Sequence, residues 1–271
     1  SGLHKMMLIG LGKHEGAKIY HRAIMDFSFL EIIRAVADEV LNRCKVIAGL
    51  GIVENAYDET GMIAAVAPEE FFEREKELLV TAKKWMPRLP FEKADLLIVD
   101  QIGKDISGSG MDTNVVGRKY NDHSATERDS VAVKRIFVRG LTEATHGNAC
   151  GLGMAEFTNQ RTIDSVDLEI TRINTITGGH PTGAMLPIAR TTDQLVLEDA
   201  LQTIGLTPPE NARIIHISDT LHLKEVLVSA AYQDQFASRD DLTVLGPSFP
   251  MQFDADGNLH SVAEIALGQT V

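Results

Sequence analysis

The spacing of hydrophobic residues in the first third of the chain predicts helices. Between residues 14 and 43, apolar side chains recur close to the helical period, and Asp26 or Ser28 can cap the second part of this segment. Residues 68–85 begin with a proline and carry acidic side chains early and lysines late, as the helix dipole favours. We therefore predict helices over both segments, with the charged face of the second exposed to solvent.

Shorter apolar runs predict β-strands. The runs at residues 45–53 and 62–67 lie on either side of a polar turn, which is the pattern of a β-hairpin. Residues 94–100 read ADLLIVD, a continuous apolar run that ends on an aspartate. Such a run is typical of a buried strand in an open parallel sheet, where functional groups gather at strand ends. Residues 131–141 alternate between apolar and polar positions and predict another strand.

Strands and helices continue to alternate in the second half of the chain. The elements predicted there are a glycine-rich turn entering a helix at residues 145–157, a helix from Thr191, Thr192 or Asp193 toward Gly205, a strand at 212–219, a helix at 221–232 and a strand at 240–246. The order predicts an α/β fold in which a mixed sheet is flanked by helices, with residues 1–271 forming one domain.

Composition narrows the classes of function. A net charge of −12 with no basic stripe argues against a nucleic-acid partner. The two cysteines, Cys44 and Cys150, are far apart and lack CxxC spacing, so neither a disulfide framework nor a zinc site is indicated. The sequence contains no signal peptide and no apolar run of membrane length. We expect a cytoplasmic protein without a membrane partner.

The first twenty-one residues place a lysine and a histidine in a pattern that can hold a cofactor. Lys5 follows a small Ser1–Gly2 pair and precedes an apolar run with two glycines, and His21 comes sixteen residues after it. A lysine in such surroundings can have a buried, reactive amine, and a histidine on a following helix can reach a metal or cofactor held there.

A second stretch, residues 101–120, carries features of an anion-binding loop. It contains four glycines, Gly103, Gly108, Gly110 and Gly117. Glycines let the backbone turn tightly and approach a ligand closely, and we predict that Gly108 and Gly110 contact the cofactor. Arg118 and Lys119 close the loop and are the predicted partners of a substrate carboxylate, Arg118 through two parallel hydrogen bonds.

The motifs SGLHKMMLIGLGKHEGA and GKDISGSGMDTNVVGR resemble those of the nickel-pincer lactate racemase family, formerly a domain of unknown function, and in particular an uncharacterised branch of it. The resemblance implies that Lys5 tethers a nickel-pincer nucleotide, a pyridinium mononucleotide with two sulfur-bearing groups. It implies that His21 donates a ring nitrogen to the nickel. It also implies a lactate racemase-like C-terminal domain, with residues 1–26 at the boundary to a preceding N-terminal domain.

The same resemblance implies a racemase or epimerase of a 2-hydroxy acid or sugar acid that works by reversible hydride transfer. Relatives acting on lactate carry a glutamine and a lysine near the position of Gly117 and Arg118, so this chain departs from the lactate pattern. The expected partners are the small hydroxy-acid substrate, the chain's own N-terminal domain and, as an open possibility, further copies of the chain. The domain alone is expected to be inactive, because the catalytic bases would come from the N-terminal part.

Two other classes of function stay open at the level of sequence. One is a hydrolase or lyase with a conventional divalent metal, although the chain has no HExxH motif and no paired aspartates. Its metal ligands would come from His14, His21, His123, His146 or His180 with Asp112 or Asp122. The other is a binding module without catalysis, in which the glycine loops hold a nucleotide and Lys5 pairs with its phosphate.

Overall fold

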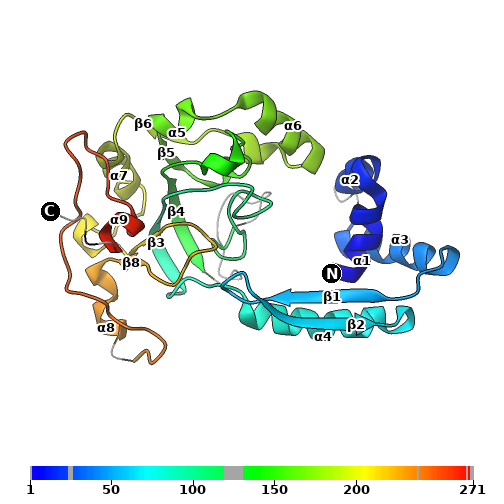
Figure 1. Cartoon of the computed structure of the whole chain (residues 1–271). Helices are drawn as coiled ribbons and strands as arrows, with labels where there is room; N and C mark the ends of the chain where they lie inside the picture. Colours follow the sequence, from blue (N-terminus) through cyan, green and yellow to red (C-terminus); the bar gives the residue numbers. More distant parts are fainter. Residues whose placement is uncertain (1, 24–26, 119–130, 237, 267, 269–271) are drawn as a thin grey trace. The chain divides into compact units, whose positions relative to one another are not determined.

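The computed structural model describes residues 2–23, 27–118, 131–236, 238–266 and 268. The chain divides into two compact units (Figure 1). Unit 1 comprises Ser1–Pro87 with the short segment Ile176–His180, and unit 2 comprises Arg88–Thr175 with Pro181–Val271. The sequence predicts one domain, and within unit 1 the first third of the chain buries a small apolar core of its own.

The helices of unit 1 follow the predicted pattern in two segments. The segment predicted as helix over residues 14–43 forms most of α2 and all of α3. Ser28 caps α3 in a capping box, in which its hydroxyl accepts from the backbone N–H of Glu31 and the Glu31 carboxylate accepts in return. The bounds are α1 Gly2–Lys5, the π-helix η1 Met6–Gly10, α2 Leu11–Ala23 and α3 Phe29–Arg43.

The predicted hairpin and the helix after it are both present in unit 1. Strand β1 pairs antiparallel with β2, and Ile52 lies opposite Ile63 on the exposed face of the pair. Their other face packs toward α4, whose Phe71 shares a buried cluster with Met7 of the π-helix. The bounds are β1 Gly49–Glu54, β2 Thr60–Val66, η2 Pro68–Glu70 and α4 Phe71–Trp85.

Unit 2 is built on a sheet of six described strands, which confirms the predicted α/β fold with a mixed sheet. The strand order is β6-β5-β4-β3-β7-β8. The first five strands in this order are parallel to one another, and β8 runs antiparallel at the edge. The bounds are β3 Lys93–Val99, β4 Ala132–Val138, β5 Phe157–Asn159, β6 Ile188–Arg190, β7 Ile214–Ile217 and β8 Leu227–Val228.

Alternate side chains of the central strands enter two separate cores. Leu96 and Ile98 of β3 point to the face that α7 covers, where Val196 and Ala200 are buried against them. Leu97 and Val99 point to the opposite face, where the loops after β3 and β4 pack against them. This two-sided burial explains why residues 96–99 are apolar without alternation.

Helices and turns connect the strands of unit 2. The helix predicted to begin near Thr192 is α7, and the Thr192 hydroxyl caps it by accepting from the backbone N–H of Leu195. The bounds are α5 Gln160–Asp164, α6 Leu168–Gly178, α7 Asp193–Leu201, α8 Gln233–Phe236, α9 Val262–Ala266, and the short 3₁₀ turns η3 Glu143–Thr145, η4 Leu152–Met154, η5 Pro181–Ala184, η6 Pro209–Asn211 and η7 Ala230–Tyr232.

Three predicted elements of the second half differ in the structure. The helix predicted over residues 221–232 is instead a loop, the edge strand β8 and a 3₁₀ turn, because β7 takes Leu227 and Val228 as ladder partners. The strand predicted at 240–246 has no ladder partner and is irregular. The predicted helix after the turn at 145–157 gives way to β5, which extends the sheet.

None of the helices in the described part of the chain is long and apolar enough to cross a lipid bilayer.

Candidate functional site

The motif with Lys5 folds into an irregular helical segment at the start of unit 1. Lys5 is the N-cap of the π-helix, and the backbone N–H of Leu11 closes that turn on the carbonyl oxygen of Met6. Lys13 has φ 53° and ψ −151° and breaks α2 shortly afterwards. π-turns and strained backbone positions concentrate at functional sites, because such geometry persists only where the surroundings hold it.

The structure exposes Lys5 rather than burying it. Met7 and Leu8, which follow it in the π-helix, are buried, and His4 before it is buried in a pair with Glu75 of α4. With those neighbours turned inward, the Lys5 side chain lies on the outer side of the segment. The predicted buried amine is therefore wrong, while its accessibility to a covalent partner is retained.

His21 lies in the last turn of α2, and its ring nitrogen Nδ1 is buried. Among the residues that the structure describes, this atom has no hydrogen-bond partner. A buried polar atom without a partner is costly, so its position calls for a ligand, a water or an ion. Ile24, which we predicted on the same helical face, falls outside the described residues.

A second histidine belongs to the same unit. The segment with Gly179 and His180 lies close to His21, since a Cβ atom on Gly179 would be 3.1 Å from the carbonyl oxygen of His21. Gly179 has φ 72°, a conformation that glycine adopts readily. Burial lowers the pKa of His180, and the neighbouring His21 lowers it further. The His180 imidazole is therefore neutral at pH 7 and does not repel a cation.

No group of three or more His, Cys, Asp or Glu side chains converges as a metal-binding set among the described residues. A metal ion beside His21 would consequently need most of its ligands from a non-protein group.

The glycines of the loop after β3 serve loop packing to a large extent. The backbone at Gly110 packs directly against the backbone at Gly151. A Cβ on Gly110 would lie 2.0 Å from the carbonyl oxygen of Cys150, and a Cβ on Gly151 would lie 1.9 Å from the carbonyl oxygen of Ser109. Both have positive φ, 82° and 101°. Gly110 is thus buried in a backbone contact, whereas Gly108 is exposed with open space around it.

Arg118 is fully buried and its guanidinium is engaged within unit 2. Nη1 donates to the carbonyl oxygen of Met154 at 2.6 Å and to Oε1 of Glu156 at 2.7 Å. Nη2 donates to the carbonyl oxygens of Lys134 at 3.0 Å and Val133 at 3.3 Å. Burial lowers the pKa of Arg118, and the Glu156 carboxylate opposes that shift. In this structure Arg118 ties β4 to the turn before β5 rather than facing a substrate carboxylate.

Arg118→Ala should therefore destabilise the protein. The substitution removes the buried charge partner of the Glu156 carboxylate and the Arg118 donors to three carbonyl oxygens, so we expect a loss of about 3–5 kcal/mol in the free energy of unfolding. Urea denaturation measures this. Arg172→Ala is the matched control, because the Arg172–Glu169 pair is exposed and should contribute less than about 1 kcal/mol. An Arg118→Ala protein as stable as that control would show that Arg118 contributes little to stability, and Arg118 would again be a candidate for ligand binding.

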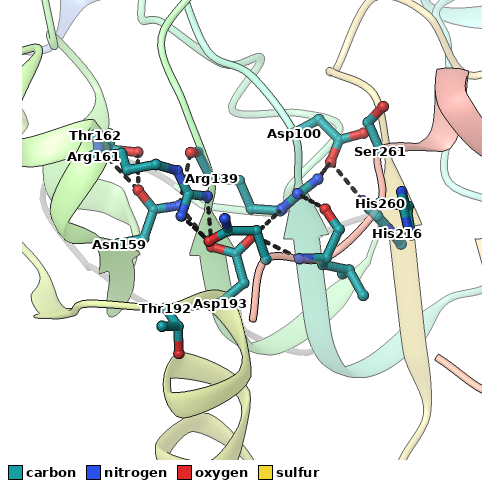
Figure 2. Close-up of polar contacts among 12 residues, drawn as sticks. Asp100, Arg139, Asn159, Arg161, Thr162, Thr192, Asp193, His216, His260 and Ser261 are labelled. Carbon is teal, nitrogen blue, oxygen red and sulfur yellow. Dashed lines mark hydrogen bonds and ion pairs between the residues drawn. The ribbon is translucent and has the colours of Figure 1, made fainter. Parts of the chain in front are cut away.

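The carboxyl ends of β3, β4 and β5 carry a buried network of charges (Figure 2). Asp193, at the start of α7, is fully buried and accepts from four groups. These are Nε of Arg139 at 2.9 Å, Nδ2 of Asn159 at 2.9 Å, Nη2 of Arg161 at 3.0 Å and the backbone N–H of Leu259 at 3.1 Å. The carboxylate is fully engaged, so its role is to hold these elements together.

Asp100 is the second acid of this network and comes directly after β3, as predicted. It pairs with Arg139, accepts from Nε2 of His216 on Oδ1 at 2.6 Å, and accepts from the backbone N–H of Val262 on Oδ2 at 2.8 Å. Burial by itself would raise the pKa of the Asp100 carboxyl. The hydrogen bond from His216 and the charges of His216 and Arg139 outweigh burial and lower that pKa.

The network docks the C-terminal part of the chain onto the sheet. Leu259 and Val262 donate backbone N–H groups to Asp193 and Asp100, and Arg139 also donates to the carbonyl oxygen of Leu259. The sequence indicated an aspartate at the end of β3 but did not indicate that Arg139 and Asp193 belong to a buried network. Arg139 directly follows β4, and Asp193 directly follows the threonine that caps α7.

The other residues considered for a metal site do not converge in the described part of the chain. His14 is exposed, and His146 has φ 51° in a turn after η3. Asp112 accepts from its own loop neighbour Asn114 at 2.7 Å. Lys119, Asp122 and His123 lie outside the described residues.

Comparison with known proteins adds no relative. No protein-family model, no curated protein and no solved structure matches the chain.

Proposed function

We propose that this chain binds a nickel-pincer nucleotide through Lys5 and His21 and forms part of a racemase or epimerase for a 2-hydroxy acid or sugar acid. The observation that carries the proposal is the buried Nδ1 of His21, which has no hydrogen-bond partner among the described residues. An imidazole nitrogen left free in this way is suited to bind a transition metal.

The residues present fit such a group. Lys5 is exposed and can form a covalent bond through its amine, and it comes sixteen residues before His21, as in the two-residue pattern of the family. His180 beside His21 has a lowered pKa and is neutral at pH 7, so it does not repel a cation nearby. When bound, the cofactor would supply a pyridinium ring able to accept and return hydride.

The tasks left to the chain are attachment, orientation and recognition of the substrate. Lys5 would attach the cofactor, and His21 would orient it. Of the residues predicted to recognise the ligand, Gly108 has open space around it and Lys119 stays a predicted carboxylate partner, whereas Arg118 and Gly110 are engaged in packing. The N-terminal domain, the small hydroxy-acid substrate and a cytoplasmic location belong to the same proposal.

The test of His21 is its nickel content. In a host that synthesises the cofactor, His21→Ala should lose most of the nickel while retaining the adduct on Lys5, because the adduct depends on the lysine amine and the nickel on the imidazole. Elemental analysis and intact mass measure the two quantities on the same sample.

The matched control is His14→Ala on the same helix, since His14 is exposed with a side-chain exposure of 67% and lies 3.9 Å from the Glu15 carboxylate. It should retain both nickel and adduct. Equal nickel in the two variants would show that His21 does not bind the metal.

A further inference from the structure

The sheet of unit 2 reverses its direction of growth between β3 and β7. From β3 the chain adds β4, β5 and β6 on one side, and it then returns to place β7 on the other side of β3. In open α/β sheets, the carboxyl ends of the two strands at such a reversal are the preferred place for a ligand. Here those loops begin at Asp100 and Ser218.

Two hydrogen bonds donated by backbone N–H groups join the two loops at this edge. The backbone N–H of Gln101 donates to the carbonyl oxygen of Ser218 at 2.9 Å. Further along, the backbone N–H of Asp112 donates to Oγ1 of Thr220 at 2.9 Å. Thr220 is buried, so the loop after β7 is held in a defined position next to the loop after β3.

The loop after β7 presents an imidazole that a buried carboxylate orients. Oδ1 of Asp219 accepts from the backbone N–H groups of Leu221 and His222 at 2.7 and 2.8 Å, and Oδ2 bonds Nδ1 of His222 at 2.8 Å. The Asp219 side chain is 12% exposed and that of His222 is 71% exposed. A carboxylate only accepts hydrogen bonds, so in the neutral ring Nδ1 carries the proton and Nε2 carries the lone pair.

We propose that Asp219 and His222 form a proton-transfer site of unit 2 that acts on a hydroxyl group of a small, uncharged polyol or sugar-like ligand. The O–H bond of the ligand breaks, its proton passes to Nε2 of His222, and the oxygen keeps the electron pair. The reverse step returns the proton, so no other reactant is needed. Asp219 positions the ring and lies against the positive charge that forms on it.

The carboxylate beside the His222 ring favours a ligand with hydroxyl groups over an anion. Asp219 places a negative charge next to the imidazole, and like charges disfavour a phosphate or carboxylate ligand. A hydroxyl group, in contrast, can donate to a carboxylate and lose its proton to an imidazole. The proposal concerns unit 2 alone and does not depend on Lys5, on His21 or on the nickel-pincer nucleotide.

The first measurement is the protonation of the His222 ring in the full chain. Nitrogen-15 NMR should find the proton of neutral His222 on Nδ1, and diethyl pyrocarbonate should acylate Nε2 of His222 severalfold faster than the ring of His14. His14 is the internal control because its side-chain exposure, 67%, is close to the 71% of His222. Asp219→Asn keeps an oxygen for the two backbone N–H groups, yet it should abolish both the Nδ1–H preference and the faster acylation.

The second measurement tests the ligand class with polyols of three to six carbons: glycerol, erythritol, xylitol and sorbitol. At least one of them should slow the acylation of His222 severalfold and leave that of His14 unchanged, and His222→Gln should remove the polyol-protected site. Equal acylation of the two histidines would overturn the proton-transfer site. Failure of all four polyols to protect His222 would overturn the assignment of a hydroxylated ligand.

Discussion

Replacing Lys5 with alanine is expected to abolish covalent loading with the cofactor. In protein made by a host that synthesises the nickel-pincer nucleotide, the intact mass should include an adduct on the order of several hundred daltons, as a mononucleotide requires, and Lys5→Ala should lack it entirely. The reason is chemical: the bond needs the amine nitrogen, and alanine has none. Electrospray mass spectrometry of the undigested protein measures the result.

Two control variants separate attachment from charge. Lys18→Ala removes a lysine of α2 that pairs with Glu15, and it should keep the adduct. Lys5→Arg keeps the positive charge but removes the nucleophilic amine, since a guanidinium is not deprotonated in proteins. If Lys5 only paired with the phosphate of a non-covalently bound nucleotide, Lys5→Arg would retain that nucleotide. An unmodified wild-type mass under cofactor-producing conditions would reject the proposed attachment.

Asp193→Ala should cause a large loss of stability. The carboxylate is fully buried and joins Arg139, Asn159, Arg161 and the backbone N–H of Leu259. Its removal leaves the mostly buried Arg139 guanidinium with one partner carboxylate fewer, and breaking a buried charge pair costs about 3–5 kcal/mol. We expect a decrease of that size in the free energy of unfolding, measured by urea denaturation.

Further variants define the origin of that effect. Asp193→Asn keeps an oxygen that accepts hydrogen bonds but removes the charge, so it should lose less stability than Asp193→Ala. Asp256→Ala is the control for loss of a carboxylate in the same unit, because Asp256 is exposed, and it should change the free energy by no more than about 0.5 kcal/mol. An Asp193→Ala protein as stable as the Asp256→Ala protein would show that the network contributes little.

Elements with a local cause were predictable from the sequence. Ser28 and Thr192 cap helices because their hydroxyls accept from backbone N–H groups three residues later, a contact that needs no distant partner. The run at residues 94–100 predicts β3 because residues 96–99 are apolar in succession, as in a strand that is buried on both faces. Lys5 and His21 were candidates from their spacing and from the family resemblance, and neither could show that Lys5 is exposed or that Nδ1 of His21 has no described partner.

The tertiary structure decided whatever depends on partners far apart in the chain. Arg118 was read as a ligand-binding residue at the end of a glycine-rich loop, yet it is buried because Glu156 and three carbonyl oxygens converge on it from β4 and the turn before β5. Residues 221–232 have apolar positions compatible with a helix. They form the edge strand β8 and a turn instead, because the open ladder of β7 offers Leu227 and Val228 backbone hydrogen bonds.

The sequence by itself determined the α/β class, the hairpin and the capped helices, since periodicity and capping act within a few residues. The tertiary structure alone decided that the chain forms two units, that Asp193 meets Arg139 from 54 residues away and that Thr220 after β7 contacts Asp112 of the loop after β3. Those outcomes depend on which polar and charged groups lie next to one another once the strands have paired. A buried charge is tolerated only where an oppositely charged or hydrogen-bonding group lies beside it.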